Sequence, residues 1–415
     1  MASTREAVAA GAIRPATWLP TSTRVAAIGI SIGDPCGVHD HAVLLARALD
    51  ADGVSISSHW LRREAESARG ARAEVTAWAA RLPAELEAAR ADAVLLHYSV
   101  FAFSHRGVPL LVGPVLAALR ARGLPLVSVL HEFAYPWRLG GVRGKVWAAS
   151  QRVALAAVMR DAAAVVVTAE SRLLWLRGRA WLPRRPVLLA PVFSNLPPAP
   201  AVRTDRPDAA PAAPRELADA GPAPASTATL GLFGYAHEGV AVETVLDALR
   251  RLREDGADVA LVLLGAPGGD SEAAAAWRQA ARARGVEGLL GFSGTLPARQ
   301  LADLLARCDV LLFAERGGPT SRKTTLAASL ASGRPVVALD GHSTWHELAS
   351  ARAARIVAAD SSSLAQAIAR LLGDGAARER QGRAGRDFAA RTMSVEHSAH
   401  VVEEALARAL GHPAP

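Results

Sequence analysis

Short apolar runs alternate along the chain with longer segments in which apolar residues recur every three or four positions. In the first half the apolar runs cover residues 24–33, 54–61, 91–99, 125–133, 162–171 and 186–194. Helical periodicity covers 39–53, 75–90 and 111–122. Apolar runs without polar alternation are typical of parallel strands that are buried on both faces and covered by helices.

The same alternation restarts near residue 229. Strand-like runs cover 229–235, 257–266, 289–294, 309–315, 335–340 and 354–360, and helical segments cover 240–255, 272–285, 296–308, 363–373 and 396–410. The pattern predicts an α/β protein with two doubly wound, Rossmann-like domains that face a central cleft. In such sheets, ligands bind beyond the carboxyl ends of the strands.

Length and composition set the domain boundaries. A chain of 415 residues exceeds one ordinary core and suggests two domains. Residues 1–22 lack an apolar signal segment and predict a disordered tail, and the Pro/Ala-rich stretch 196–228 predicts a linker. The domains are then 23–195 and 229–394, and 395–415 forms a C-terminal helix that is expected to pack back towards the first domain.

Charge and cysteine content narrow the class of protein. The formal net charge is +8, but no nucleic-acid-binding motif accompanies it, so nucleic acid is not an expected partner. No apolar run is long enough to span a membrane. Cys36 and Cys308 lie far apart, which suits a reducing, cytoplasmic compartment without disulfides. The segment 172–186 combines five arginines with two tryptophans, which favours either peripheral contact with an anionic membrane or a packed helix with extended arginines.

A glycine- and hydroxyl-rich turn follows the apolar run 309–315. Gly317 and Gly318 permit a tight turn, and Thr320 or Ser321 is expected to cap a helix that ends at Gly333. Free N–H groups at the start of that helix would point out of the carboxyl edge of the sheet. This arrangement predicts an anion site.

Cations reinforce the anion site. The turn contains Arg322 and Lys323, one of only two lysines in the chain, and their charges suit a diphosphate. A second glycine-rich turn places the backbone of Gly234 where it is expected to meet the same phosphates. The alternative interpretation is an ordinary capped helix with a solvated basic turn.

Four further residues are candidates for the cleft. Gly37 precedes a predicted helix and allows close approach of the backbone to a ligand, and His39 begins that helix. His97 lies near the end of an apolar run, and Glu315 lies just before the cationic turn. Each also has a structural alternative, as turn, cap or salt-bridge residue. His39 and His41 are two positions apart and do not share a helical face, so no metal site is expected.

With these residues in place, the chain resembles family 4 glycosyltransferases of the GT-B fold. The resemblance rests on residues 28–49 with their Cys-Gly turn, the stretch ending at His131, and, in the second half, 232–249, 292–313 and 329–341. It implies an acceptor-binding domain over 23–195 and a nucleotide-sugar-binding domain over 229–394. It also implies transfer with retention of configuration, without a cofactor or a required metal, and His131 as the catalytic residue that contacts the transferred sugar.

The chain departs from that family at two points. The usual E-x7-E carboxylates fall at Thr320 and Ala328, and the usual phosphate-binding cation after the glycine turn falls at Val240. The turn instead resembles a subgroup reading G-x-S-x-R-R-x-S-L. That subgroup implies donor-binding roles for Thr320, Arg322, Lys323 and Thr325, and Ser321 is a further donor-binding candidate as a hydroxyl of the same turn.

Three functions remain open at this level. The first is a glycosyltransferase that moves a sugar from a nucleotide diphosphate sugar to a glycan, lipid-linked or small-molecule acceptor. The second is a non-catalytic GT-B protein that binds nucleotide or glycan, which the missing carboxylates favour. The third is a nucleotide-sugar epimerase, which would need acid and base carboxylates that the sequence does not place in the cleft.

Overall fold

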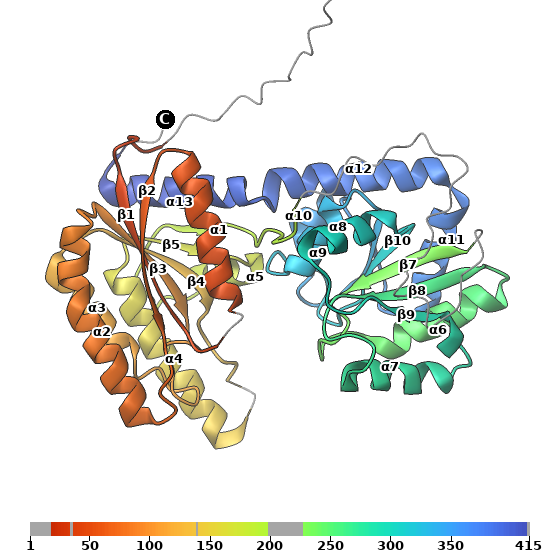
Figure 1. Cartoon of the computed structure of the whole chain (residues 1–415), viewed down its shortest axis with the longest axis horizontal. Coiled ribbons are helices and arrows are strands. Elements are labelled where there is room, and N and C mark those ends of the chain that lie inside the picture. The colour runs from red at the N-terminus through yellow and green to blue at the C-terminus, as the bar shows by residue number, and fades with distance from the viewer. Residues whose placement is uncertain (1–17, 34–35, 138–139, 198–226, 413–415) are drawn as a thin grey trace, which may run out of the picture.

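The computed structural model describes residues 18–33, 36–137, 140–197 and 227–412. They form two α/β domains, each built around a six-stranded sheet (Figure 1). The predicted α/β class with two Rossmann-like halves is confirmed. The tail residues 1–17 and the predicted linker residues 198–226 lie outside the described residues.

The first sheet has the order β2-β1-β3-β4-β5-β6, and all neighbouring strands are parallel. Helices α2 to α5 contribute to the core on one face, and α1 packs on the other. The strands are β1 (Arg24–Ser31), β2 (Ser55–Arg62), β3 (Ala93–Ser99), β4 (Leu126–Glu132), β5 (Ala164–Val167) and β6 (Val187–Leu189). The helices are α1 (Gly37–Ala51), α2 (Ala68–Ala88), α3 (Val112–Arg122), α4 (Gly141–Asp161) and α5 (Glu170–Arg177).

The second sheet has the order β12-β11-β10-β7-β8-β9, again all parallel. Counted from its own first strand this is the Rossmann order 3-2-1-4-5-6. The strands are β7 (Ala228–Phe233), β8 (Val259–Leu264), β9 (Leu290–Phe292), β10 (Val310–Phe313), β11 (Val336–Leu339) and β12 (Arg355–Val357). The helices are α6 (Val242–Glu254), α7 (Glu272–Arg282), α8 (Ala298–Arg307), α9 (Thr324–Ala331), α10 (His346–Ser350), α11 (Ser361–Gly373) and α12 (Gly375–Thr392), and residues Glu287–Leu289 form one 3-10 turn.

The last helix returns to the first domain. Helix α12 lies on the second domain, and α13 (Val395–Leu410) continues across to pack on the first sheet beside α1 (Figure 1). The Leu19 N–H donates to the buried carboxylate of Glu403 at 3.0 Å, and the Trp18 indole donates to His400. The predicted disordered tail 1–22 is therefore wrong for residues 18 and 19, which pack on α13.

Among the helices that the sequence analysis did not predict are two long ones, α4 and α12. Helix α4 leaves Val142, Val146 and Val153 exposed, so its apolar residues do not form one stripe. Helix α12 is rich in arginine and glycine, and Gly382 and Gly385 lie buried against α9 and its C-terminal turn. In both helices tertiary packing, rather than apolar periodicity, stabilises the element.

The return of α13 makes the first domain depend on the far end of the chain. Leu406 is fully buried against the first sheet. We expect Leu406→Ala to lower the free energy of unfolding of the first domain by about 2–5 kcal/mol, because it removes buried methyl groups and leaves a cavity. Urea unfolding followed by domain-resolved hydrogen exchange measures this. Arg408→Ala, at a half-exposed residue of the same helix, should cost about 1 kcal/mol or less. Equal losses in the two variants would contradict the packing of α13.

Candidate functional site

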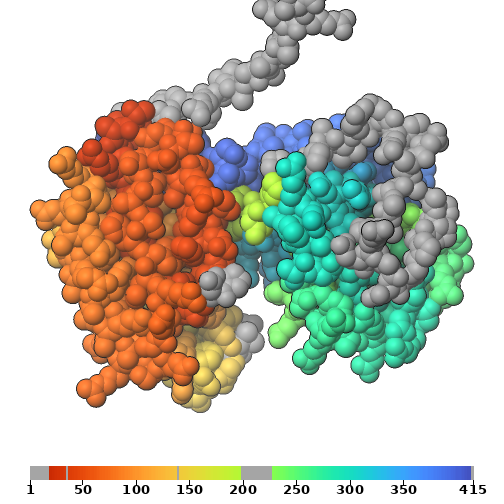
Figure 2. All heavy atoms as spheres, in the orientation of Figure 1, coloured from red at the N-terminus to blue at the C-terminus, as the bar shows by residue number. Residues whose placement is uncertain are grey.

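A cleft lies between the two lobes (Figure 2), and residues at or after the carboxyl ends of β4, β5 and β10 line it. A pocket of about 470 Å³ lies there. The first domain supplies the start of α1, the end of β4, the β5–α5 junction and the segment 192–195, and the second domain supplies the turn before α9. The lining residues are Cys36, Gly37, Val38, Asp40, His41, Leu44, His131, Glu132, Thr168, Arg172, Val192, Phe193, Asn195, Arg322, Lys323 and Thr324.

The turn between β10 and α9 is held by close backbone packing. Gly318 has a φ of +83°, and a Cβ there would lie 2.8 Å from the Gly341 backbone nitrogen. A Cβ on Gly341 would in turn lie 2.3 Å from the Gly317 carbonyl carbon. The glycines therefore permit two loops of the second domain to pack against each other, and this packing positions the turn.

Helix α9 begins later than predicted. Its first residue is Thr324 and its N-cap is Lys323, so neither Thr320 nor Ser321 caps it, contrary to expectation. No side chain accepts a hydrogen bond at this N-cap. The N–H groups of the first turn are therefore left for another acceptor beside the pocket, which Thr324 lines.

Ser321 joins the two domains. Its hydroxyl donates to the Thr168 carbonyl oxygen at 3.1 Å and accepts from the Glu170 N–H at 3.3 Å. Its own carbonyl oxygen accepts from the Val192 N–H at 2.8 Å. Because these bonds occupy the buried Ser321 hydroxyl, the residue positions the turn, and its expected contact with the donor is not supported.

Arg322 and Lys323 both line the pocket, but their charges differ in availability. Lys323 forms an ion pair with Glu315 at 2.7 Å, and both side chains are only about 15% exposed. Arg322 is exposed and has no ion-pair partner among the described residues. Glu315 was a candidate for the cleft. It instead neutralises Lys323 beside the cleft, so Arg322 is the principal unpaired cation of the turn.

The remaining candidates of the second domain lie behind the turn. Gly234 has a φ of +83°, and a Cβ there would lie 2.8 Å from the Thr325 Cγ2 atom. The Gly234 N–H donates to the Leu264 carbonyl oxygen. This N–H is therefore not free to meet a phosphate, contrary to expectation. The Thr320 hydroxyl is buried and has no hydrogen-bond partner among the described residues.

The first-domain candidates separate in space. Gly37 opens α1 on the pocket wall, and a Cβ there would meet nothing within 4 Å, which leaves room for a ligand. His39 packs on the Trp60 ring instead, with ring centroids 4.8 Å apart, and does not line the pocket. The expectation that His39 would face the acceptor is not supported by this position.

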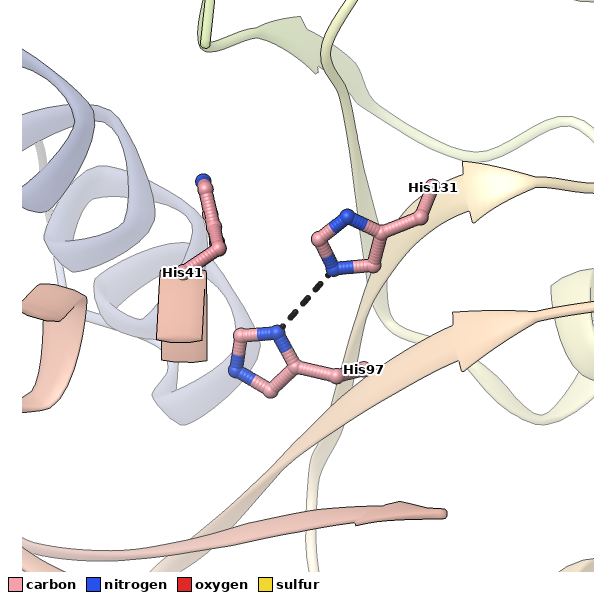
Figure 3. Close-up of side chains that lie close together, drawn as sticks. All are labelled: His41, His97 and His131. Carbon is pink, nitrogen blue, oxygen red and sulfur yellow. Dashed lines mark hydrogen bonds between the residues drawn. The ribbon is translucent and has the colours of Figure 1, made fainter. Parts of the chain in front are cut away.

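Three histidines from three elements converge at the pocket floor (Figure 3). His131 is the penultimate residue of β4 and lines the pocket, and its Nε2 lies 3.2 Å from the Nδ1 of His97 in a hydrogen bond. His97 is buried on β3 behind His131, so it supports the site rather than lining it as predicted. His41 comes from α1, and its ring stacks on Phe193.

Burial keeps these imidazoles neutral. It lowers the pKa of His41 to about 4 and, together with nearby histidines, the pKa of His97 to about 3. Burial also lowers the pKa of His131 well below its usual value, and His41, His97 and Arg172 lower it further. Each neutral imidazole offers one donor and one acceptor.

Arg172 was not among the candidates of the sequence analysis. It lies in the first turn of α5, after the carboxyl end of β5, is 3.8 Å from Glu132 in an ion pair, and lines the pocket. Burial lowers its pKa to about 10, and the charge of Arg322 acts in the same direction. Its place directly after an apolar run was the available signal, because strand ends line the cleft in such folds.

A second pocket lies on the first domain, away from the cleft. It has a volume of about 730 Å³ and is lined by Pro136, Trp137, Arg152, Val153, Ala156, Arg160, Trp175, Arg179 and Trp181, which we call the arginine–tryptophan patch. Arg152 stacks on Trp137 at 4.5 Å, and Arg179 stacks on Trp175 at 4.7 Å. Trp137 and Trp181 are about half exposed. No helix of the described residues is long and apolar enough to cross a membrane.

Comparison with known proteins places the fold. Residues 227–374 match a family model described as glycosyl transferases group 1. No curated protein matches the chain significantly in sequence. Because the family model covers only the second domain, it describes that domain and not the whole chain.

Solved structures match over both domains. A glycosyltransferase from Rickettsia africae has 11% identity and a TM-score of 0.67 over 94% of this chain and 99% of its own. HepE from Anabaena, solved in complex with UDP, has 16% identity and a TM-score of 0.63 over 92% and 99%. Sucrose-phosphate synthase from Thermosynechococcus elongatus has 15% identity and a TM-score of 0.62 over 91% and 96%. The fold is therefore the GT-B arrangement of two Rossmann-like domains.

The buried histidines should make stability depend on pH. An unfolded histidine takes up a proton near a pKa of about 6.5, whereas folded His41 and His97 stay neutral down to about 4 and about 3. The unfolded chain therefore binds more protons in this window, and stability falls as pH falls. We expect each such histidine to lower the free energy of unfolding by about 1.4 kcal/mol per pH unit between about pH 6 and its folded pKa, about 4 for His41 and about 3 for His97.

Urea unfolding at a series of pH values measures this slope. In His97→Gln the free energy of unfolding should change less steeply with pH than in the unsubstituted protein, because this variant lacks one group whose pKa differs between the folded and unfolded states. The exposed His342→Gln serves as the matched control and should keep the full slope. An unchanged slope in His97→Gln would contradict the neutral, buried state of His97.

Proposed function

We propose that this protein is a nucleotide-sugar-dependent glycosyltransferase. The single observation that carries the proposal is the pocket between the domains, in which Arg322 and the uncapped start of α9 face His131. A diphosphate needs cations and free N–H groups, and a sugar needs neutral donors and acceptors. The two walls of one pocket provide these two sets of groups, and the second-domain wall belongs to a segment that matches group 1 glycosyl transferases.

The donor diphosphate would bind at the second-domain wall. Arg322 is the unpaired cation there, and the first-turn N–H groups of α9 add the positive end of the helix dipole. The Lys323–Glu315 pair holds the base of the turn, so Lys323 contributes a partly neutralised charge. HepE, which shares the fold, was solved with UDP, so UDP is the first nucleotide to test.

The transferred sugar would lie between the turn and His131. The bond between the anomeric carbon and the diphosphate oxygen breaks, and the electron pair leaves on that oxygen, where Arg322 and the start of α9 stabilise the charge. The acceptor hydroxyl oxygen bonds to the anomeric carbon and gives its proton to the departing phosphate oxygen. Retention of configuration follows from attack on the face that the diphosphate leaves.

The same arrangement supports transfer without a required metal ion or cofactor. Arg322 and the helix dipole provide positive charge at the leaving group, which is the task that a divalent ion performs in other transferases. The neutral His131 would hydrogen-bond the sugar rather than carry charge. The acceptor would enter from the first domain beside Gly37, where open space adjoins the backbone.

A non-catalytic nucleotide-binding role is the second candidate. Thr320 and Ala328 replace the family carboxylates, and among the pocket carboxylates Glu132 is paired with Arg172. A panel of UDP-, GDP-, ADP- and dTDP-sugars, with release of nucleotide as the readout, separates the two roles. Tight binding without hydrolysis or transfer under all acceptors would favour the binding role.

Loss of the unpaired cation should weaken nucleotide binding. We expect Arg322→Ala to lower the affinity for the preferred nucleoside diphosphate about tenfold or more, because a charge-assisted contact is worth about 1.5–3 kcal/mol. Isothermal titration calorimetry with the diphosphate measures this, and thermal unfolding should be little changed because Arg322 is exposed.

Arg316→Ala is the matched control. Arg316 lies in the same turn but pairs with Glu243 on α6, outside the pocket. Its removal should leave diphosphate affinity within about twofold, the effect expected for a surface ion pair. Equal affinity in Arg322→Ala and the unsubstituted protein would remove the donor site from this turn.

We also propose that the first domain contacts an anionic membrane through the arginine–tryptophan patch. The exposed Val153 of α4 lines this patch beside its stacked arginines and half-exposed tryptophans, and Val142 and Val146 are exposed on the same helix. Basic and aromatic groups beside exposed apolar side chains suit the headgroup layer of an anionic bilayer. A lipid-linked acceptor would then be reached from the membrane face.

An acidic substitution in this face should weaken membrane binding. We expect Val153→Asp to reduce sedimentation with vesicles of phosphatidylglycerol and phosphatidylcholine by about half or more, because it places a charge among the lipid chains. Ala376→Asp, an exposed site on the second domain, makes the same change of charge and should sediment normally. Absence of sedimentation of the unsubstituted protein would refute the membrane contact.

A further inference from the structure

The histidine cluster at the pocket floor contains buried ring nitrogens that have no hydrogen-bond partner in the described part of the chain, and the proposed contact of His131 with a sugar does not explain them. Both ring nitrogens of His41 and the Nε2 of His97 are buried and have no hydrogen-bond partner among the described residues. A buried polar atom without a partner is costly, so such atoms need an explanation. They belong to one cluster of side chains that bind metals well, and a metal bound to one His41 nitrogen would give that atom the partner it lacks.

We propose that His41, His97 and His131 form a binding site for a borderline transition-metal ion such as Zn²⁺ at the floor of the interdomain pocket. One ligand nitrogen from each residue lies within 4.8 Å of the others. The three side chains come from α1, β3 and β4, and their rings surround one space (Figure 3). Three imidazoles with one open position are a known type of zinc ligand set.

The spacing of the two strand histidines suits a metal as well as a hydrogen bond. The His97 Nδ1 and His131 Nε2 atoms are 3.2 Å apart. Two nitrogens on one tetrahedral zinc, each bound at about 2.0–2.1 Å, lie about 3.3 Å apart. A metal would therefore replace the shared proton at nearly the same nitrogen–nitrogen distance, and each ring would turn so that its nitrogen points at the metal. The His41 ring, edge-on to His131 at an angle of 84°, would supply the third nitrogen, which lies within 4.8 Å of the other two and would move closer on metal binding.

The groups around the three histidines affect the orientation of the rings and the charge at the site. Phe193 stacks on His41 with ring centroids 4.7 Å apart and an angle of 22°, which limits rotation of that ring. Arg172, whose charge acts on His131, is paired with Glu132 at 3.8 Å, which offsets part of that charge. Neutral nitrogen ligands without a carboxylate favour Zn²⁺, Co²⁺, Ni²⁺ or Cu²⁺ over Mg²⁺ or Ca²⁺, which prefer oxygen.

The fourth position of such a metal would open into the pocket, because His41 and His131 line it. This consequence rests on the proposed function: a metal held there would occupy the space of the transferred sugar beside His131. Zn²⁺ would then inhibit transfer by competing with the nucleotide sugar. The metal is thus an inhibitor of the site, and transfer itself still needs no metal.

Direct binding tests the site without any sugar. We expect the unsubstituted full chain to bind one equivalent of Zn²⁺ in calorimetry, and Co²⁺ to give the intense visible absorption of a four-coordinate site. Because alanine is well tolerated in a helix such as α1, His41→Ala should fold. This variant should weaken Zn²⁺ binding at least tenfold and remove the Co²⁺ spectrum. His97→Gln should do the same, and circular dichroism verifies its folding.

His39→Ala is the matched control, because His39 lies on the same helix but packs on Trp60. It should bind Zn²⁺ as the unsubstituted chain does. Absence of stoichiometric binding, or binding unchanged in His41→Ala, would overturn the site. Neither result bears on the donor site, which the Arg322→Ala titration with diphosphate tests separately. Zn²⁺ binding without loss of nucleotide-sugar affinity would overturn the competition alone.

Discussion

The hydrogen bonds of Ser321 to the first domain are the contact on which the candidate site depends. The Ser321 hydroxyl and carbonyl reach the backbone after β5 and the segment before the linker, at 3.1 Å and 2.8 Å. Arg322 and Lys323 follow directly in the chain, so these bonds place the cations of the second domain opposite the strand ends of the first. A cleft between two rigid sheets becomes a pocket because this turn crosses the gap.

The crossing turn also divides the polar groups by type. On one side lie an unpaired guanidinium and an uncapped helix start, which suit an anion. On the other side lie imidazoles that burial keeps neutral. The second domain therefore provides the groups that stabilise negative charge, and the first domain provides the groups that hydrogen-bond hydroxyls. This separation is what a nucleotide sugar, with its charged and neutral ends, would use.

Helix α13 gives the two domains a second connection. It leaves the second domain after α12 and packs on the first sheet beside α1, whose start forms one wall of the pocket. The Glu170 carboxylate at the start of α5 adds a bond to the His346 N–H of the second domain. The domains therefore meet at the Ser321 turn, at the Glu170–His346 contact and through α13. Any opening of the cleft would have to rearrange these contacts.

The sequence alone determined the two parallel sheets and the cationic turn, because continuous apolar runs and clustered glycines, hydroxyls and cations are local patterns. It did not determine the start of α9, where the prediction placed a cap at Thr320 or Ser321, since Ser321 bonds to another domain. It also missed the Lys323–Glu315 pair and the meeting of His41 with His97 and His131, residues that lie 34 or more positions apart in the chain. The spacing of apolar residues indicates which face of a helix or strand is buried. Which buried side chains contact each other depends on how α1 packs against β3 and β4, and only the tertiary structure shows this.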